Sequence, residues 1–201
     1  MRRERPAMST KDLKFLKYLG VPKTEEQCFY AIHSDYKRRN EAVCPHAPLG
    51  LTPVQGAKPG TSKSIRYIDA LILFRKGERW AVEIKVTKQD LAQELQRPEK
   101  TVLWREHTHA FYYAVPLPLV EWALDNIPQG IGVMVCSDQS TQIVRRARKN
   151  KTPAEIPYST WRRIAGRLGD MHAKMGQDKP EHVPPDRLLV RRRSLPTTRP
   201  A

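Results

Sequence analysis

The stretch YIDALILFRKGERWAVEIKV, residues 67–86, decides the fold of this chain. In its second half, apolar residues recur with a period of two, at Trp80, Val82, Ile84 and Val86. This period is typical of a β-strand with one buried face, and residues 65–74 form a second run of strand-forming residues. The short RKGE segment between the two runs carries Gly77, so we predict a β-hairpin.

Three ionisable residues, Asp69, Glu83 and Lys85, lie inside these predicted strands. Glu83 and Lys85 are two residues apart and therefore share one face of their strand. The length of the hairpin loop decides where Asp69 points. A two-residue loop would place the two carboxylates on opposite faces, whereas a three-residue loop at 76–78 pairs Asp69 with Lys85 and places all three side chains on one face. We predict the odd-length loop or an equivalent bulge.

Two carboxylates that converge at a hairpin form a hard-oxygen site suited to Mg²⁺ or Mn²⁺. Such an ion neutralises a phosphodiester oxygen and lowers the pKa of a bound water, and a neighbouring lysine can orient that water. The alternative is a structural Glu–Lys pair on a half-exposed strand, which is weakly stabilising. The spacing by itself leaves both interpretations open.

The remaining patterns predict an α/β protein with a mixed sheet and helices packed on its faces. Helices are expected at 9–19, where Ser9 is the cap, and from the capping box TEEQ at Thr24 to about residue 40. The Pro- and Gly-rich segment 41–63 is expected to be a long loop. After the hairpin, the patterns predict a helical segment at 87–107 divided at Pro98, strands at 109–116, 131–137 and 141–147, and helices at 119–126 and 158–176.

The charge balance is far from neutral, because 36 lysine and arginine residues face 21 aspartate and glutamate residues, for a net charge of +15 over 201 residues. This excess indicates an anionic partner, of which nucleic acid is the commonest. The N-terminal segment has no continuous apolar run, and the longest apolar stretch is too short to cross a bilayer. Three widely spaced cysteines predict neither a disulfide framework nor a zinc site. We therefore expect a cytoplasmic protein with no membrane partner.

An Asp followed one hairpin later by Glu-x-Lys resembles the PD-(D/E)XK nuclease superfamily. More closely, the segments EIKVTKQDLAQEL, HAFYYAVP, IPQGIGVMVC and QIVRRA are similar to the MmcB-like DNA-repair endonucleases and their bacteriophage relatives, over residues 66–147. The resemblance implies a restriction-endonuclease-like αβββαβ core at about 24–147, in a single nuclease domain of residues 1–177. A flexible basic tail at 178–201 would follow. The sequence departs from the family at Ile68, where a proline often precedes the Asp, and in its long 41–63 segment.

Carried over to this sequence, the resemblance implies Asp69 and Glu83 as metal ligands, Lys85 as the catalytic lysine, and the backbone carbonyl of Ile84 as a further ligand. The implied cofactor is Mg²⁺ or Mn²⁺. Glu25 matches an additional glutamate ligand from the first core helix, although an acidic residue in a first turn also complements the helix dipole.

Two polar positions after the Glu-x-Lys strand match the resemblance as well. Asp90 either belongs to the site or only starts a helix, and Lys100 is interpreted as a phosphate contact.

Further basic residues gather in two later segments, and we interpret them as phosphate contacts that give affinity without sequence recognition. They are Arg145, Arg146, Arg148, Lys149, Lys151, Arg162 and Arg163, with more arginines at 167 and 191–193. The alternative for any one cluster is a solvated basic face. We expect His107 and His109 to be strand-end residues rather than catalytic bases, and Trp104 and Tyr113 to be core residues.

Together these observations favour a metal-dependent DNA endonuclease of phage or bacterial DNA repair or processing. Two alternatives stay open. One is a DNA-binding protein of the same fold that cuts weakly or not at all, and the other is a phage accessory or anti-defence protein that acts on a protein partner. A homodimer is compatible with the resemblance, and the sequence specifies neither the DNA structure nor the cleavage specificity.

Overall fold

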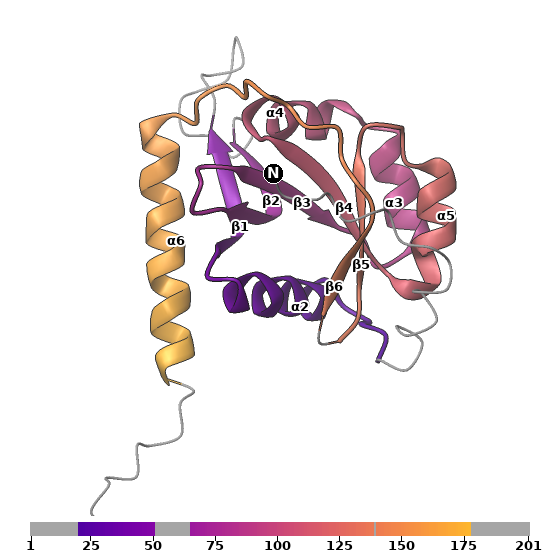
Figure 1. Cartoon of the computed structure of the whole chain (residues 1–201), viewed down its shortest axis with the longest axis horizontal. Helices are drawn as coiled ribbons and strands as arrows, with labels where there is room; N and C mark the ends of the chain where they lie inside the picture. The colour runs from indigo at the N-terminus through magenta and orange to yellow at the C-terminus, as the bar shows by residue number, and fades with distance from the viewer. Residues whose placement is uncertain (1–19, 51–64, 139, 178–201) are drawn as a thin grey trace, which may run out of the picture.

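The computed structural model describes residues 20–50, 65–138 and 140–177. The strands of this part form one six-stranded sheet in the order β1-β2-β3-β4-β5-β6. Neighbouring strands pair antiparallel except β3–β4 and β4–β5, which are parallel. Helices flank the sheet (Figure 1), which confirms the predicted α/β class with a mixed central sheet. The helix predicted at 9–19 and the tail predicted at 178–201 lie outside the described residues.

Helix α2 (Glu25–Arg38) begins at the predicted capping box, where the Thr24 hydroxyl accepts the Gln27 N–H at 3.2 Å. Strand β1 (Ala42–Gly50) follows, so the prediction of a loop at 41–63 is wrong over these residues. Pro45 and Pro48 gave this segment its loop-like composition. β1 lies at the edge of the sheet, where a residue without an N–H group is tolerated.

Strands β2 (Ile65–Leu73) and β3 (Arg79–Ile84) form the predicted hairpin. The Phe74 N–H donates to the Glu78 carbonyl at 2.8 Å, so the loop has three residues, 75–77, and starts one residue earlier than predicted. Gly77 closes it with φ +82, a left-handed conformation that glycine adopts without strain.

The earlier loop moves the hairpin register by two residues. Ala70 pairs with Val82, which puts Asp69 across from Glu83 rather than across from Lys85, as predicted. A shift of two residues preserves the alternation of side chains along the strands, so this register keeps the parity on which the prediction of one shared face depends.

The helical segment predicted at 87–107 consists of α3 (Lys88–Leu95) and α4 (Glu99–His107), divided at Pro98 as expected. The chain then forms β4 (Ala110–Pro116), the short 3-10 helix η2 (Leu117–Leu119), α5 (Val120–Asn126), β5 (Gly132–Cys136), β6 (Thr141–Arg145) and α6 (Tyr158–Gln177). The order from α2 to β4 is the expected αβββαβ order, and β5, β6 and α6 extend it. None of the helices in the described ranges is long and apolar enough to cross a membrane.

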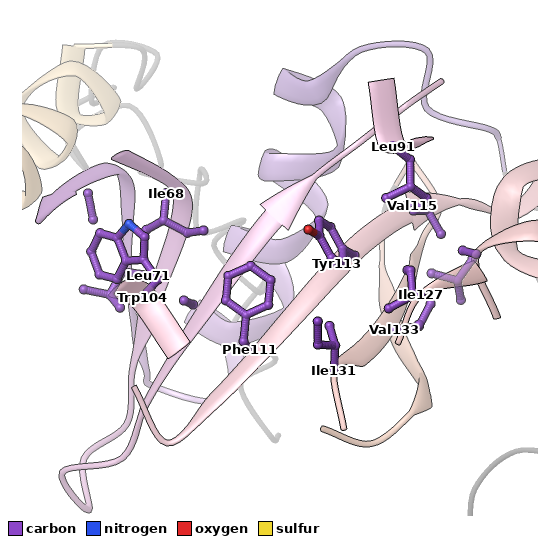
Figure 2. Close-up of a cluster of buried hydrophobic side chains, with 14 of the residues drawn as sticks. Ile68, Leu71, Leu91, Trp104, Phe111, Tyr113, Val115, Ile127, Ile131 and Val133 are labelled. Carbon is purple, nitrogen blue, oxygen red and sulfur yellow. The ribbon is translucent and has the colours of Figure 1, made fainter. Parts of the chain in front are cut away.

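Two apolar clusters hold the helices against the sheet. On one face, Cys28, Ile32 and Tyr36 of α2 pack onto the sheet. On the other face, residues of α3, α4 and α5 surround the aromatic side chains of β4, and Figure 2 shows Leu91, Trp104 and Tyr113 among them. Trp104 and Tyr113 are buried in this core, as predicted. Glu83 and Lys85 follow Ala81 on this second face of β3.

Candidate active site

The predicted site forms where strands β2 and β3 separate. Their pairing ends at Ala70 and Val82, and beyond it the Ile84 N–H of β3 donates to the Asp69 carboxylate at 2.7 Å. The side chain of Asp69 therefore takes the place of a backbone acceptor. This bond holds the carboxylate beside the Glu-x-Lys segment.

Lys85 joins the two carboxylates. Its Nζ lies 2.6 Å from Glu83 Oε1 and 4.0 Å from Asp69 Oδ2. The three side chains are largely buried, with 12% of Lys85, 14% of Glu83 and 20% of Asp69 exposed. The structure thus brings together the three residues that the sequence singled out, with the ammonium group next to both carboxylates.

The charges at this site are unusual for a strand. Burial, followed by the negative charge of Asp69, raises the pKa of Glu83 to about 7, although Lys85 acts in the opposite direction. Burial alone would lower the pKa of Lys85, but the charges of Glu83, Asp69 and Glu25 outweigh it and raise that pKa. Negative charge is therefore in excess here, and a further cation would relieve it.

Asp69 lines a cleft of about 640 Å³ that we call the acidic cleft, between α2, β1 and α6. Its other ionisable lining residues are Glu25, Glu26, His46, Arg167 and Asp170, and Ile84 also lines it. Glu25 therefore lies on the same cleft as Asp69. Partial burial and then the negative charge of Asp69 raise the pKa of Glu25.

His46 is a residue of this cleft that the sequence analysis did not assign to the site. Its neighbours Pro45 and Ala47 pair with Ala70 and Ile68, the neighbours of Asp69, and its Nδ1 is 4.0 Å from Asp69 Oδ1. Its backbone has φ +42, which is uncommon for a residue other than glycine. The run Cys44-Pro45-His46 is a weak signal in the sequence, because it resembles at most half of a zinc site and does not point to Asp69.

Glu83 lines a second cleft, of about 240 Å³, on the α4 side of the sheet. Lys100 lines it too and donates to the buried Glu94 carboxylate at 2.9 Å. Asp69 and Glu83 therefore line two different clefts. The Lys85 ammonium group lies near both carboxylates. Asp90 lines neither cleft. It lies at the start of α3, where its N–H donates to the Thr87 hydroxyl at 3.1 Å and its carboxylate accepts from that hydroxyl at 2.6 Å.

The donor types fit a hard divalent cation. Asp69, Glu83 and Glu25 offer carboxylate oxygens, and together they carry an excess of negative charge that a cation would balance. Within residues 20–50, 65–138 and 140–177, no three histidine, cysteine, aspartate or glutamate side chains converge closely enough to hold a metal ion by themselves. Mg²⁺ needs fewer protein ligands than that, since it commonly binds one or two carboxylates and keeps several waters.

The predicted phosphate contacts that the structure describes lie in more than one place. Arg148, Lys149 and Lys151 line a third cleft of about 400 Å³, which we call the basic cleft, together with Arg105. This cleft includes Ala110, which pairs with Trp80 at the start of β3, whereas Glu83 lies near the end of β3. The basic cleft and the acidic residues therefore occupy opposite ends of the same strands.

Arg145 requires a correction. We predicted a phosphate contact, but its guanidinium group donates to four backbone carbonyls at 2.8–3.4 Å, those of Leu124, Ile127, Pro128 and Ile131. These bonds tie β6 to the end of α5, so Arg145 has a structural role. Arg146 on β6's C-terminal side and Arg162 and Arg163 on α6 are exposed.

His107 is the last residue of α4 and His109 directly precedes β4, and both make backbone contacts. His107 Nδ1 lies 3.0 Å from the Leu103 carbonyl, and His109 Nδ1 accepts the Arg79 N–H at 3.2 Å. Burial, then the positive charge of Arg79, lowers the pKa of His109.

No family model matches the chain, and no curated protein sequence matches it. Among solved structures, the chain is similar to a protein of unknown function from Silicibacter pomeroyi, with a TM-score of 0.50 and 17% sequence identity. The similarity covers 76% of this chain and 88% of that chain. At this identity the likeness shows a shared α/β fold.

Proposed function

We propose that this protein is a metal-dependent DNA endonuclease of bacterial or phage DNA repair or processing, acting in the cytoplasm. The observation that carries the proposal is the meeting of Asp69, Glu83 and Lys85 where β2 and β3 separate. An isolated structural Glu–Lys pair would not require a second and a third carboxylate beside it. Here Asp69 and Glu25 both raise the local negative charge.

Asp69, Glu83 and the Ile84 carbonyl, with Glu25 as a further carboxylate, would hold Mg²⁺ or Mn²⁺. When bound, such an ion supplies charge neutralisation at a phosphodiester oxygen and a lowered pKa of water. Lys85 is positioned to donate from Nζ to the attacking water or to a phosphoryl oxygen, because its three N–H groups are not all used by Glu83. Hydrolysis then forms one P–O bond to the water oxygen and breaks one ester P–O bond.

DNA would be held by phosphate contacts away from the carboxylates. The basic cleft offers Arg105, Arg148 and Lys151, while α6 offers Arg162 and Arg163. Such contacts give an affinity that falls steeply with salt and is insensitive to sequence. This distribution supports DNA as the partner, and a homodimer remains compatible with it.

The proposal is tested by cleavage assays on duplex, single-stranded, branched and damaged DNA with Mg²⁺ or Mn²⁺. We expect Glu83→Ala to lower the cleavage rate by about 10²-fold or more while DNA binding survives. Glu121→Ala, which removes an exposed glutamate on α5, is the matched control and should cleave like the wild type.

If the wild-type protein cuts none of these substrates, the enzymatic proposal fails. Salt-dependent DNA binding without cleavage would then favour a DNA-binding protein of this fold. Absence of DNA binding would favour a protein that acts on a protein partner.

A further inference from the structure

Helix α2 presents aromatic as well as acidic side chains to the acidic cleft. Glu25 and Glu26 line the cleft, and Phe29 and Tyr30 line it one turn later. Residues four apart share one face of a helix, so these four side chains form a continuous wall. Tyr30 is 51% exposed, and its ring lies edge-on to that of Phe29, with 6.1 Å between the centroids.

The other walls of the cleft come from β1 and α6. His46, whose side chain is 69% exposed, lies on β1 beside Asp69. Arg167 and Met171 of α6 face the cleft four residues apart, and the Arg167 guanidinium lies over the Tyr67 ring at 5.5 Å. Aromatic rings and a cation thus surround a carboxylate that we assign to catalysis.

We propose that the acidic cleft receives an unpaired nucleotide of the DNA substrate, with its base stacked on the ring of Tyr30 and its backbone beside Asp69. This inference rests on the proposed nuclease function and names its substrate class, which is single-stranded DNA or an unpaired segment next to a duplex. An exposed aromatic ring binds unpaired bases because their faces are free, whereas bases in a duplex already stack on their neighbours. The volume of about 640 Å³ lies within the range of small-ligand sites.

The charge of the cleft adds a condition. Glu25, Glu26, Asp69 and Asp170 outnumber the basic lining residues Arg167 and His46. A DNA phosphate can therefore approach Asp69 only together with a divalent cation, and stacking on Tyr30 should depend on that cation.

The acidic and aromatic lining would also suit a cationic peptide. DNA is favoured, because the whole chain carries a net charge of +15 and would repel a basic partner at long range. The exposed Arg162 and Arg163 lie one turn before Arg167 on α6, so basic residues also stand near the cleft.

The test measures binding to oligonucleotides that carry 2-aminopurine, a base whose fluorescence falls when it stacks. The probes are a single strand, a blunt duplex, and a duplex with an unpaired overhang, each with Ca²⁺ to prevent turnover and each repeated with a chelator. The variants are Tyr30→Ala, Tyr30→Phe, which keeps the ring, and Tyr158→Ala. Tyr158 is 79% exposed at the start of α6 and does not line the cleft, so it is the matched aromatic control.

We expect Tyr30→Ala to weaken binding to the single strand and the overhang by about 5- to 150-fold, because stacking on an aromatic ring contributes about 1–3 kcal/mol per base. Blunt-duplex binding should change by less than about twofold in the same variant. Tyr30→Phe and Tyr158→Ala should bind all probes like the wild type. The 2-aminopurine emission should fall only when Ca²⁺ is present and the ring at position 30 is kept.

An equal loss on duplex and single strand, or no fluorescence change with the wild-type protein, overturns the inference. Displacement of the single strand from the cleft by a short polylysine peptide, with Tyr30→Ala weakening the peptide instead, also overturns it. Cleavage without stacking supports the nuclease function and rejects this inference. Stacking without cleavage supports binding of an unpaired base in the cleft and rejects the nuclease function.

Discussion

Replacing Lys85 by methionine tests the electrostatic account of the site. The variant keeps the length of the side chain and removes the ammonium group that lies 2.6 Å from Glu83 and 4.0 Å from Asp69. Breaking a buried ion pair typically costs about 3–5 kcal/mol, because the remaining charge is left without its partner. Here the cost depends on pH, since Glu83, with a pKa of about 7, can become neutral by binding a proton.

At about pH 6 the Glu83 carboxyl is largely protonated in the folded protein, so we expect the variant to lose only about 1 kcal/mol of unfolding free energy. Without Lys85 the pKa of Glu83 rises further, so the folded variant keeps Glu83 protonated at higher pH. This lowers its unfolding free energy relative to the wild type by about 1.4 kcal/mol for each further unit of rising pH. The loss should therefore reach about 3–4 kcal/mol near pH 9.

Urea unfolding without divalent ions, at both pH values, measures these losses. The double variant Lys85→Met, Glu83→Gln is the control, because it removes both charges and should lose the extra pH dependence. A Lys85→Met penalty that is equal at the two pH values, or a double variant that keeps the pH dependence, would refute the reasoning.

Three further outcomes are expected. The metal-free wild-type protein should gain stability as the pH falls from about 7 towards 4.5, by up to about 1.4 kcal/mol per pH unit. The reason is that the raised pKa of Glu83 makes the folded state bind a proton more readily than the unfolded state does. In a series of urea unfolding curves at different pH values, Glu83→Gln should flatten this part of the pH dependence. Arg145→Met should lower the unfolding free energy by about 2 kcal/mol, since several partly buried carbonyls lose their donor, and should leave the salt dependence of DNA binding unchanged in anisotropy titrations. Arg148→Gln combined with Lys151→Gln should reduce the slope of log K against log salt by about 2, and an unchanged slope would remove the basic cleft from the DNA path.

The hairpin and its charged residues were predictable because they follow from strand periodicity. A period of two fixes which side chains share a face, and Gly77 marks the turn. The sequence could not determine which three residues form the loop. Loops at 75–77 and at 76–78 both contain Gly77, and only the position of the Phe74–Glu78 pair chooses between them. The odd length of the loop was therefore predicted correctly, but the residue predicted to pair with Asp69 was wrong by two positions.

Strand β1 and Arg145 show where local patterns fail. Pro45 and Pro48 are strong loop signals, and their tolerance in β1 depends on its place at the sheet edge, which is a property of the whole fold. Arg145 and Arg146 are adjacent arginines, and nothing in the sequence distinguishes their roles. The end of α5 lies within reach of the Arg145 guanidinium group, so Arg145 has a structural role.

Tyr30 and His46 could be assigned to the cleft only from the structure. His46 faces Asp69 through the pairing of β1 with β2, and no strand was predicted at β1. Tyr30 had a weak sequence signal, because it follows Glu26 by four residues and lies off the buried stripe of α2. Its meaning depends on α6, which closes the cleft from a distant part of the chain.

The most direct test of the central claim is to locate Mn²⁺ by anomalous diffraction in crystals of the protein soaked with that ion. The account predicts an anomalous peak in contact with carboxylate oxygens of both Asp69 and Glu83, with Lys85 Nζ displaced from between them. The peak should vanish in Asp69→Asn crystals. A wild-type map with no peak at these two carboxylates, and with the Lys85–Glu83 pair intact under saturating Mn²⁺, would contradict the claim that this hairpin is a metal-dependent catalytic site.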